Sequence, residues 1–234
     1  MRVIAGTARG RPLRAPPGDT TRPTSDKIKG VIFSMLEAEA MRRGFEHRED
    51  DDERDGRFAL GVAWPRVLDL YAGTGALAIE ALSRGAASAD LVEPNAAARK
   101  AIEVNLARTG FTDRARVHRI TSEQVASTLR GPYDLILLDP PYDTESVGLL
   151  ARLADGALLD DAGAIVWEHA KDTAPPPTIP AAAGGRRLSL VRTRVHGAAG
   201  VSLYASAIEP TGIEPRGEPT GMEPTGMVPA GGAA

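Results

Sequence analysis

Residues 67–77 read Val67-Leu68-Asp69-Leu70-Tyr71-Ala72-Gly73-Thr74-Gly75-Ala76-Leu77, and they are the strongest indication of the fold class. A short apolar strand runs into a glycine-rich turn, and the turn opens an apolar helix that ends at Gly85. Glycines at a strand-to-helix turn let the backbone approach a ligand closely. Ala78 breaks the Gly-x-Gly-x-x-Gly pattern, and no Gly-Lys-Ser/Thr follows, so neither a dinucleotide fingerprint nor a P-loop is indicated. Asp69 would repel a pyrophosphate and attract a cationic amine.

Strands and helices alternate from this turn to residue 207. This alternation predicts a mostly parallel sheet with helices on both faces, closed by an antiparallel pair. Ligands then belong beyond the carboxyl ends of the strands. The expected strands are 67–70, 89–92, 115–120, 133–138, 164–168, 187–194 and 201–207, and the expected helices are 76–84, 95–110, 122–129 and 145–154.

An acidic residue, Glu93, closes the second expected strand and precedes Pro94. A carboxylate at this position can accept both hydroxyls of a ribose. A ligand with an amine, a ribose and no phosphate fits S-adenosylmethionine better than NAD; a structural turn followed by a chance surface Glu is the simpler alternative. The predicted cofactor-binding residues are Asp69, Tyr71, Ala72, Gly73, Thr74, Gly75, Glu93, Pro94, Thr121 and Ser122.

The tetrapeptide Asp139-Pro140-Pro141-Tyr142 follows the strand 133–138. The Asp139 carboxylate and the Pro140 carbonyl can accept both hydrogens of a planar amine, and Tyr142 can stack on the heterocycle that carries it. We therefore predict Asp139, Pro140, Pro141 and Tyr142 as catalytic residues acting on a nucleobase amine. A rigid turn with a surface aromatic is the structural alternative.

The net charge of −3 hides an uneven distribution. Residues 1–29 carry seven basic residues against two acidic ones, which is typical of a nucleic-acid contact but also of a solvated terminus. We expect a basic arm or hairpin over 1–23 and a helix over 24–41, capped by Thr24 or Ser25. The body, 24–207, carries a mixed-charge loop at 42–63, and the Pro/Gly-rich stretch 208–234 is predicted to be a disordered tail.

The chain has no cysteine, which excludes disulfides and thiolate metal sites and is typical of a cytoplasmic protein. No apolar run is long enough for a membrane span, and the start has no signal-peptide pattern. The acidic run near residue 50 lacks the glycine and glutamate of a calcium loop, so we expect no metal site.

These motifs together resemble the RsmD family of bacterial 16S rRNA (guanine-N2) methyltransferases over roughly residues 1–207. The specific likeness lies in Arg2–Gly6 with Arg9–Leu13 and in Arg22–Lys27, while 69–77 and 139–142 are shared by many amine methyltransferases. The resemblance implies a class I, Rossmann-like methyltransferase fold with a seven-stranded sheet and an N-terminal extension. It also implies S-adenosylmethionine as cofactor, 16S rRNA or a small-subunit particle as partner, and an RNA clamp that includes Arg9, Arg11, Arg22 and Lys27. We expect a monomer. The chain departs from the family at Gly30, where Glu is usual, and at Ser34, where Asn is usual.

Two other functions stay open at this stage. Asp-Pro-Pro-Tyr also serves adenine-N6 methylation of DNA, although the chain has no sizeable target-recognition region. A non-catalytic RNA-binding assembly factor could keep the same fold, although intact Asp69, Gly73, Gly75, Glu93 and Asp139 argue against decay.

Overall fold

One eight-stranded sheet forms the centre of the computed structural model, which describes residues 1–16, 25–45, 60–141, 146–155, 157–179 and 187–206. The strand order is β3-β2-β1-β4-β5-β8-β7-β6, with parallel pairing from β3 to β5 and antiparallel pairing from β5 onward. The strands are β1 Arg66–Leu70, β2 Ser88–Val92, β3 Ala115–His118, β4 Tyr133–Leu138, β5 Leu159–Ala170, β6 Thr178–Ile179, β7 Leu188–His196 and β8 Ala199–Ser206.

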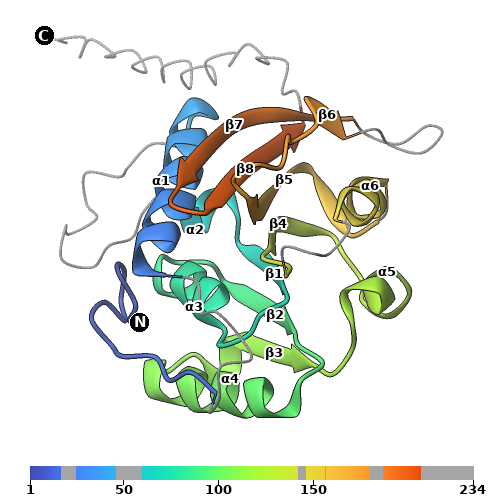
Figure 1. Cartoon of the computed structure of the whole chain (residues 1–234). Coiled ribbons are helices and arrows are strands. Elements are labelled where there is room, and N and C mark those ends of the chain that lie inside the picture. Colours follow the sequence, from blue (N-terminus) through green and yellow to red (C-terminus); the bar gives the residue numbers. More distant parts are fainter. Residues whose placement is uncertain (17–24, 46–59, 142–145, 156, 180–186, 207–234) are drawn as a thin grey trace, which may run out of the picture.

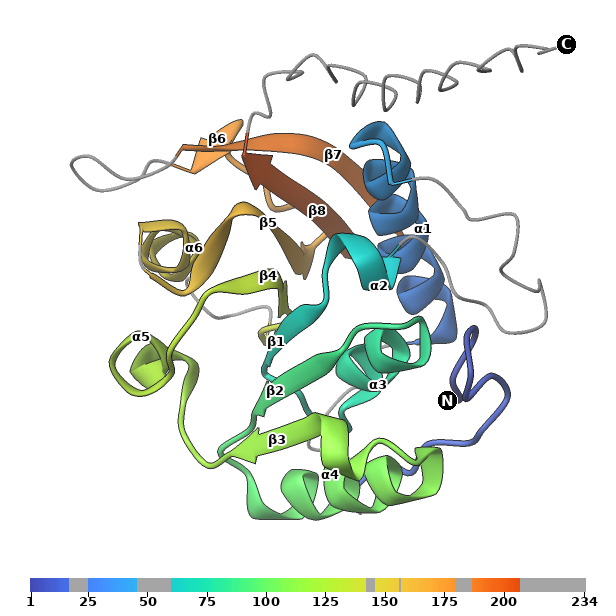
Figure 2. The ribbon, with the colours of Figure 1, turned by 180° about the vertical axis from the view of Figure 1, so that it is seen from behind.

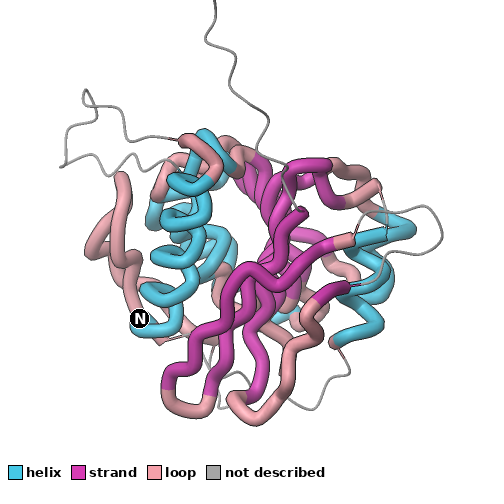
Figure 3. The backbone as a smooth tube through the Cα atoms, turned by 90° about the horizontal axis from the view of Figure 1, so that it is seen from above, coloured by secondary structure: helices cyan, strands magenta, loops and turns pink. Residues whose placement is uncertain are grey.

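Helices cover both faces of this sheet, as predicted (Figure 3). On one face α1, α3 and α4 share a buried apolar cluster with β1, β2 and β8, and on the other α5 and α6 enclose a second cluster. Figure 2 shows the two groups on opposite sides of the strands. The helices are α1 Asp26–Arg42, α2 Leu60–Ala63, α3 Ala76–Ser83, α4 Ala96–Thr109, α5 Val125–Thr128 and α6 Val147–Asp155, with short 3₁₀ turns η1 Thr112–Arg114 and η2 Ser122–Gln124.

The helix ends follow local sequence signals. Ser25 caps α1 because its side chain accepts a hydrogen bond from the amide of Ile28. Asn95 caps α4 in the same way, and Gly110 ends it in the left-handed conformation. Thr24, the other predicted cap, lies outside the described residues.

The first thirteen residues form a hairpin rather than a free arm. Arg2 pairs with Pro12, and the amide of Val3 donates to the carbonyl of Arg11. This N-terminal hairpin lies against α3: the Glu80 carboxylate accepts the amides of Ile4 and Ala5 at 2.8 and 2.9 Å. The hairpin can approach α3 this closely only because Gly6 (φ +78°) has no side chain. A Cβ at this position would lie 1.9 Å from the Ser83 carbonyl oxygen.

The structure corrects several sequence-based boundaries. The sheet has eight strands rather than seven, because the two-residue β6 pairs with the edge of β7. Part of the expected loop 42–63 is helical, since α1 extends to Arg42 and α2 packs against α3, with Gly61 against the Gly85 backbone. The expected helix 122–129 divides into η2 and α5, and β5 begins well before residue 164. The acidic run 46–55 and the tail 208–234 lie outside the described residues.

Candidate active site

Three carboxylates meet where β1, β2 and β4 end. In the sheet register Leu70 of β1 is level with both Val92 of β2 and Leu138 of β4. Glu93 and Asp139 each follow directly after those residues, and Asp69 precedes Leu70. Two motifs that lie far apart in the sequence are thus brought to one edge of the sheet, as the strand order predicts.

The glycine-rich turn is held in a strained, well-connected shape. Tyr71, Gly73 and Gly75 have φ values of 60°, 55° and 75°, in the left-handed region. The Ala72 amide donates to the Val92 carbonyl at 3.1 Å, and the Gly75 amide donates to the Ala72 carbonyl at 2.7 Å. The space above Gly73 is open, because a Cβ there would contact only the Tyr71 carbonyl at 3.8 Å. Open space over Gly73 is therefore left for a prospective ligand.

Asp69 is a buried carboxylate with one unused oxygen. Its Oδ2 accepts the Ala78 amide at 3.0 Å, whereas Oδ1 has no hydrogen-bond partner among the described residues. Burial, against the opposing hydrogen bond from Ala78 and with the added repulsion of the nearby charges of Asp139 and Glu93, raises the pKa of Asp69 to about 8. An orphaned buried oxygen of this kind suits a bound cationic amine, because the cation would restore the ionised form.

Glu93 joins the turn to α4. Its Oε2 accepts the amide of Gly73 at 2.9 Å, and its Oε1 accepts the amide of Asn95, the cap of α4, at 2.8 Å. Each carboxylate oxygen keeps a further lone pair, so Glu93 can still accept ligand hydroxyls. Pro94 is exposed, and its carbonyl accepts Arg99.

Beyond β3 the predicted residues Thr121 and Ser122 begin η2. Thr121 forms a capping box with Gln124, and the buried Ser122 hydroxyl donates to Glu123 at 3.2 Å. Across from them, burial raises the pKa of Tyr71, whose hydroxyl faces Ser122 without a hydrogen bond of normal geometry in the described structure.

The end of β4 carries the predicted catalytic motif. Asp139 is half-buried, Pro140 is buried and Pro141 is exposed. The charge of Asp139 acts on Asp69, which places the two carboxyls in one site. Tyr142 lies outside the described residues, so its position remains a prediction.

Comparison with known proteins gives a consistent assignment. The family described as "Conserved hypothetical protein 95" matches residues 1–205. The chain belongs to this family. It is the RsmD family that the sequence motifs indicated.

Individual relatives extend over nearly the same length. The Bacillus subtilis (strain 168) protein YlbH, named as an rRNA methyltransferase, is 34% identical over 87% of this chain and 98% of its own. Ribosomal RNA small subunit methyltransferase D of Escherichia coli (strain K12) is 30% identical over 87% of this chain and 89% of its own. The solved structure of the Escherichia coli methyltransferase yhhF has a TM-score of 0.65 at 28% identity, covering 88% of this chain and 97% of its own. The fold is therefore that of a class I, Rossmann-like methyltransferase.

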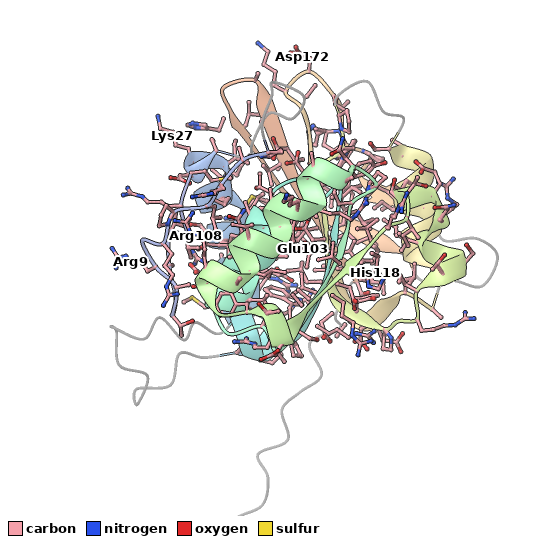
Figure 4. The ribbon with its side chains drawn as sticks, turned by 90° about the horizontal axis from the view of Figure 1, so that it is seen from below. Arg9, Lys27, Glu103, Arg108, His118 and Asp172 are labelled. Atoms are coloured by element: carbon pink, nitrogen blue, oxygen red, sulfur yellow. The ribbon has the colours of Figure 1, made fainter. Side chains whose placement is uncertain are left out.

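The RNA-contacting residues predicted from this family resemblance differ in their contacts within the protein. Arg9 and Lys27 are exposed, and Figure 4 shows both on the side of the molecule that carries the hairpin and α1. Arg11 is exposed, but its Nη1 donates to the Arg108 carbonyl at 2.5 Å, so it also anchors the hairpin to the end of α4. Arg22 lies outside the described residues.

Two residues that connect the hairpin to the site were missed from the sequence. Asn105, fully buried in α4, donates to the Thr74 carbonyl of the glycine turn and to the Arg14 carbonyl, each at 2.9 Å, and accepts the Arg14 amide at 2.8 Å. Glu80 is fully buried in α3 and holds Ile4 and Ala5. The sequence pattern that could have identified Asn105 and Glu80 is a polar residue on an otherwise apolar helix face.

The described ranges hold no group of three His, Asp or Glu side chains placed to bind a metal ion. None of their helices is both long and apolar enough to cross a bilayer.

Proposed function

We propose that this protein transfers a methyl group from S-adenosylmethionine to the exocyclic N2 of a guanine in 16S rRNA. The observation that carries the proposal is the meeting of Asp69, Glu93 and Asp139 at one sheet edge in a member of the RsmD family. A ribosomal RNA substrate would place the reaction in the cytoplasm.

The residues of the turn fit the cofactor. Oδ1 of Asp69 is unused and buried, so it would hold the ammonium group of the cofactor. Glu93 would accept the ribose hydroxyls, and the backbone of Gly73 and Gly75 would lie against the ligand. Thr121 and Ser122 would border the adenine. S-adenosylmethionine supplies an electrophilic methyl group on its sulfonium sulfur.

The catalytic work of the chain is to orient a weak nucleophile. The lone pair of an aromatic amine is delocalised into its ring. Asp139 and the Pro140 carbonyl would accept its two N–H groups, which favours a pyramidal nitrogen with its lone pair directed at the methyl group. Tyr142 would stack on the base, a contact worth about 1–3 kcal/mol. The guanine must be unpaired or flipped out to enter.

Recognition of the RNA would be shared between pocket and surface. The residues that would contact phosphates, and so fix the register of the RNA on the protein, are Arg9, Arg11, Arg22 and Lys27. Such contacts carry no sequence information, so the pocket would select the base.

Product identification tests the proposal. The protein is incubated with labelled S-adenosylmethionine and either undermethylated small-subunit particles or DNA, and the digested nucleosides are separated. We expect N2-methylguanosine from the particles. N6-methyladenine from DNA would replace the proposal with an adenine methyltransferase, and no product from either substrate would favour a non-catalytic assembly factor.

A variant pair tests the mechanism. Asp139→Ala should lower the turnover number by about a hundredfold or more, since it removes a preorganised acceptor from the reacting amine, and should leave cofactor affinity mostly intact. Asp113→Ala, at an exposed aspartate of η1, is the control and should change neither. Full activity of Asp139→Ala would contradict the proposed role.

A further inference from the structure

A basic groove runs between α1 and β7, outside the site described above. Its volume is about 550 Å³. We call it the α1–β7 groove; its lining residues are Lys27, Gly30, Val31, Ser34, Met35, Arg192, Arg194 and His196.

The three residues from β7 converge on α1 because they alternate along one strand. Arg192, Arg194 and His196 pair with Leu203, Val201 and Ala199 of β8. Directly paired residues point to the same face of a sheet. Those three β8 residues belong to the apolar cluster that α1 covers, so the basic side chains emerge beside α1. Lys27, in the first turn of α1, meets them from the other wall.

The charge of the groove is uncompensated within the described structure. No carboxylate is among its lining residues, and none of Lys27, Arg192 and Arg194 forms an ion pair with another described residue. All three side chains are exposed. Clustered, unpaired cations from two separate elements form an electrostatic footprint for a polyanion.

The groove is open where a polyanion would lie. A Cβ on Gly30 would have no atom within 4 Å, so the helix surface there leaves free space. Val31 and Met35 give the floor an apolar surface, against which sugars can lie, and the Ser34 hydroxyl can donate a hydrogen bond.

The sheet register places this groove on the same edge as Asp139. Leu138 is level with Trp167 of β5, so Asp139 is level with Glu168. Glu168 pairs with Val201 of β8, and Val201 pairs with Arg194 of β7. Three strand spacings separate Asp139 from Arg194, which is about 14 Å at roughly 4.8 Å per strand. A chain that enters the catalytic pocket at Asp139 can therefore continue into the groove.

We propose that the α1–β7 groove binds the phosphodiester backbone of the substrate RNA a few nucleotides from the target base. This inference rests on the proposed function for the identity of the polymer. Lys27, Arg192 and Arg194 contact phosphates, and His196 adds a hydrogen-bond donor. The groove and the N-terminal hairpin would hold the RNA on two sides of α1.

The test is the salt dependence of RNA binding. The double variant Arg192→Gln/Arg194→Gln should raise the Kd for a small-subunit RNA fragment and make the slope of log affinity against log salt shallower by about 0.7 per lost contact, or about 1.4 in all. Arg116→Gln, an exposed arginine on β3 at the opposite part of the sheet, is the matched control and should leave the slope unchanged.

A second pair uses Ser34, an exposed residue of α1 that lines the groove. Ser34→Glu places a carboxylate in the groove and should weaken RNA binding, whereas Ser34→Gln, which has the same shape without the charge, should not. Cofactor affinity, measured by calorimetry on the same variants, should stay unchanged, which shows that the fold and the methyl-donor site are intact.

The outcomes separate the groove from the proposed function. If the protein methylates guanine and the groove variants bind RNA like Arg116→Gln, the groove proposal fails and the function stands. If no RNA is methylated but the groove variants lose RNA affinity, the function fails and the groove stands. Equal losses for RNA, duplex DNA and anionic lipid vesicles would overturn the assignment of the groove to RNA.

Discussion

Lys29 and Glu80 face each other at 3.8 Å with no exposed side-chain surface on either residue. The Lys29 Nζ also contacts the Arg2 carbonyl and Asp26, and Glu80 also accepts Arg84 and the hairpin amides. Because each of the two charges has several partners, the free-energy cost of burying Lys29 and Glu80 is offset only while all of these partners are in place. The pair therefore joins the hairpin, α1 and α3 into one unit.

Glu80→Gln should lower the free energy of unfolding by about 3–5 kcal/mol, because the buried Lys29 ammonium then keeps only the partly exposed Asp26 as a charged partner and Arg84 loses Glu80 as well. Urea unfolding measures the change. Glu103→Gln, at an exposed position of α4, should change it by less than about 0.5 kcal/mol. Adding Lys29→Met to Glu80→Gln should recover part of the stability; a double variant less stable than Glu80→Gln would contradict the ion-pair explanation.

The pKa of Asp69 makes the stability of the cofactor-free protein depend on pH. The folded carboxyl has a pKa of about 8 against 3.8 for an unperturbed one, so between these values the folded state holds a proton that the unfolded chain releases. Stability from this group is fully present below pH 3.8 and is lost as the pH rises through about 8. Asp69→Asn does not titrate and should remove this part of the decline, which unfolding curves at pH 5, 7 and 9 would reveal. An unchanged decline in Asp69→Asn would show that other groups cause it.

The same Asp69→Asn variant should bind S-adenosylmethionine more weakly than the natural protein, because a neutral amide oxygen accepts a weaker hydrogen bond from the ammonium group than a carboxylate does. The two effects oppose each other: the variant gains stability without cofactor and loses the stabilisation that cofactor gives. Calorimetry and thermal unfolding with and without cofactor distinguish them. A variant that binds cofactor as tightly as the natural protein would remove Asp69 from the binding site.

A comparison of Gly75→Ala with Gly10→Ala distinguishes the destabilisation caused by backbone strain from that caused by a steric clash of the added Cβ. Both glycines have φ near +80°, which costs another residue roughly 1–2 kcal/mol. At Gly10 a Cβ meets nothing within 4 Å, whereas at Gly75 it lies 3.1 Å from the Leu91 side chain. Gly75→Ala should therefore reduce stability more than Gly10→Ala, and it alone should weaken cofactor binding. Equal effects of the two substitutions would mean that the α3–sheet contact at Gly75 is not tight.

Asn105→Ala should loosen the segment after the hairpin. The substitution leaves the buried carbonyl of Thr74 without this partner, which costs about 1–3 kcal/mol, and it removes two partly buried hydrogen bonds to the Arg14 backbone. Hydrogen exchange should show faster exchange at the Arg14 amide, with a smaller change at the Val3 amide, which bonds within the hairpin. Slow exchange at Arg14 in the variant would indicate that the segment is held by other contacts.

The repeating part of the architecture could be predicted because its signals are local. Apolar strand runs, Asn95 and Gly110 at the ends of α4, and the turn at Gly73 and Gly75 all lie within a few residues of the feature they specify. The parallel order then brought Glu93 and Asp139 to one edge without further information.

The remaining features depend on contacts between distant segments. The sequence around Glu80 does not indicate that its carboxylate accepts hydrogen bonds from the amides of residues 4 and 5. Alternation along β7 predicts that Arg192 and Arg194 share a face, but only the fold brings Lys27 beside them. Two-residue β6 and one-turn α2 were missed because such short elements have no periodicity to detect.

Asn105 contacts the glycine turn through Thr74 and the hairpin segment through Arg14. A single amide therefore links the part of the chain that would bind the methyl donor to the part that would hold RNA. Linkage is reciprocal: if donor binding orders the turn and so favours the hairpin conformation, RNA binding must strengthen donor binding by the same factor. The order in which the two substrates arrive would then change the rates but leave the total free energy of the ternary complex the same.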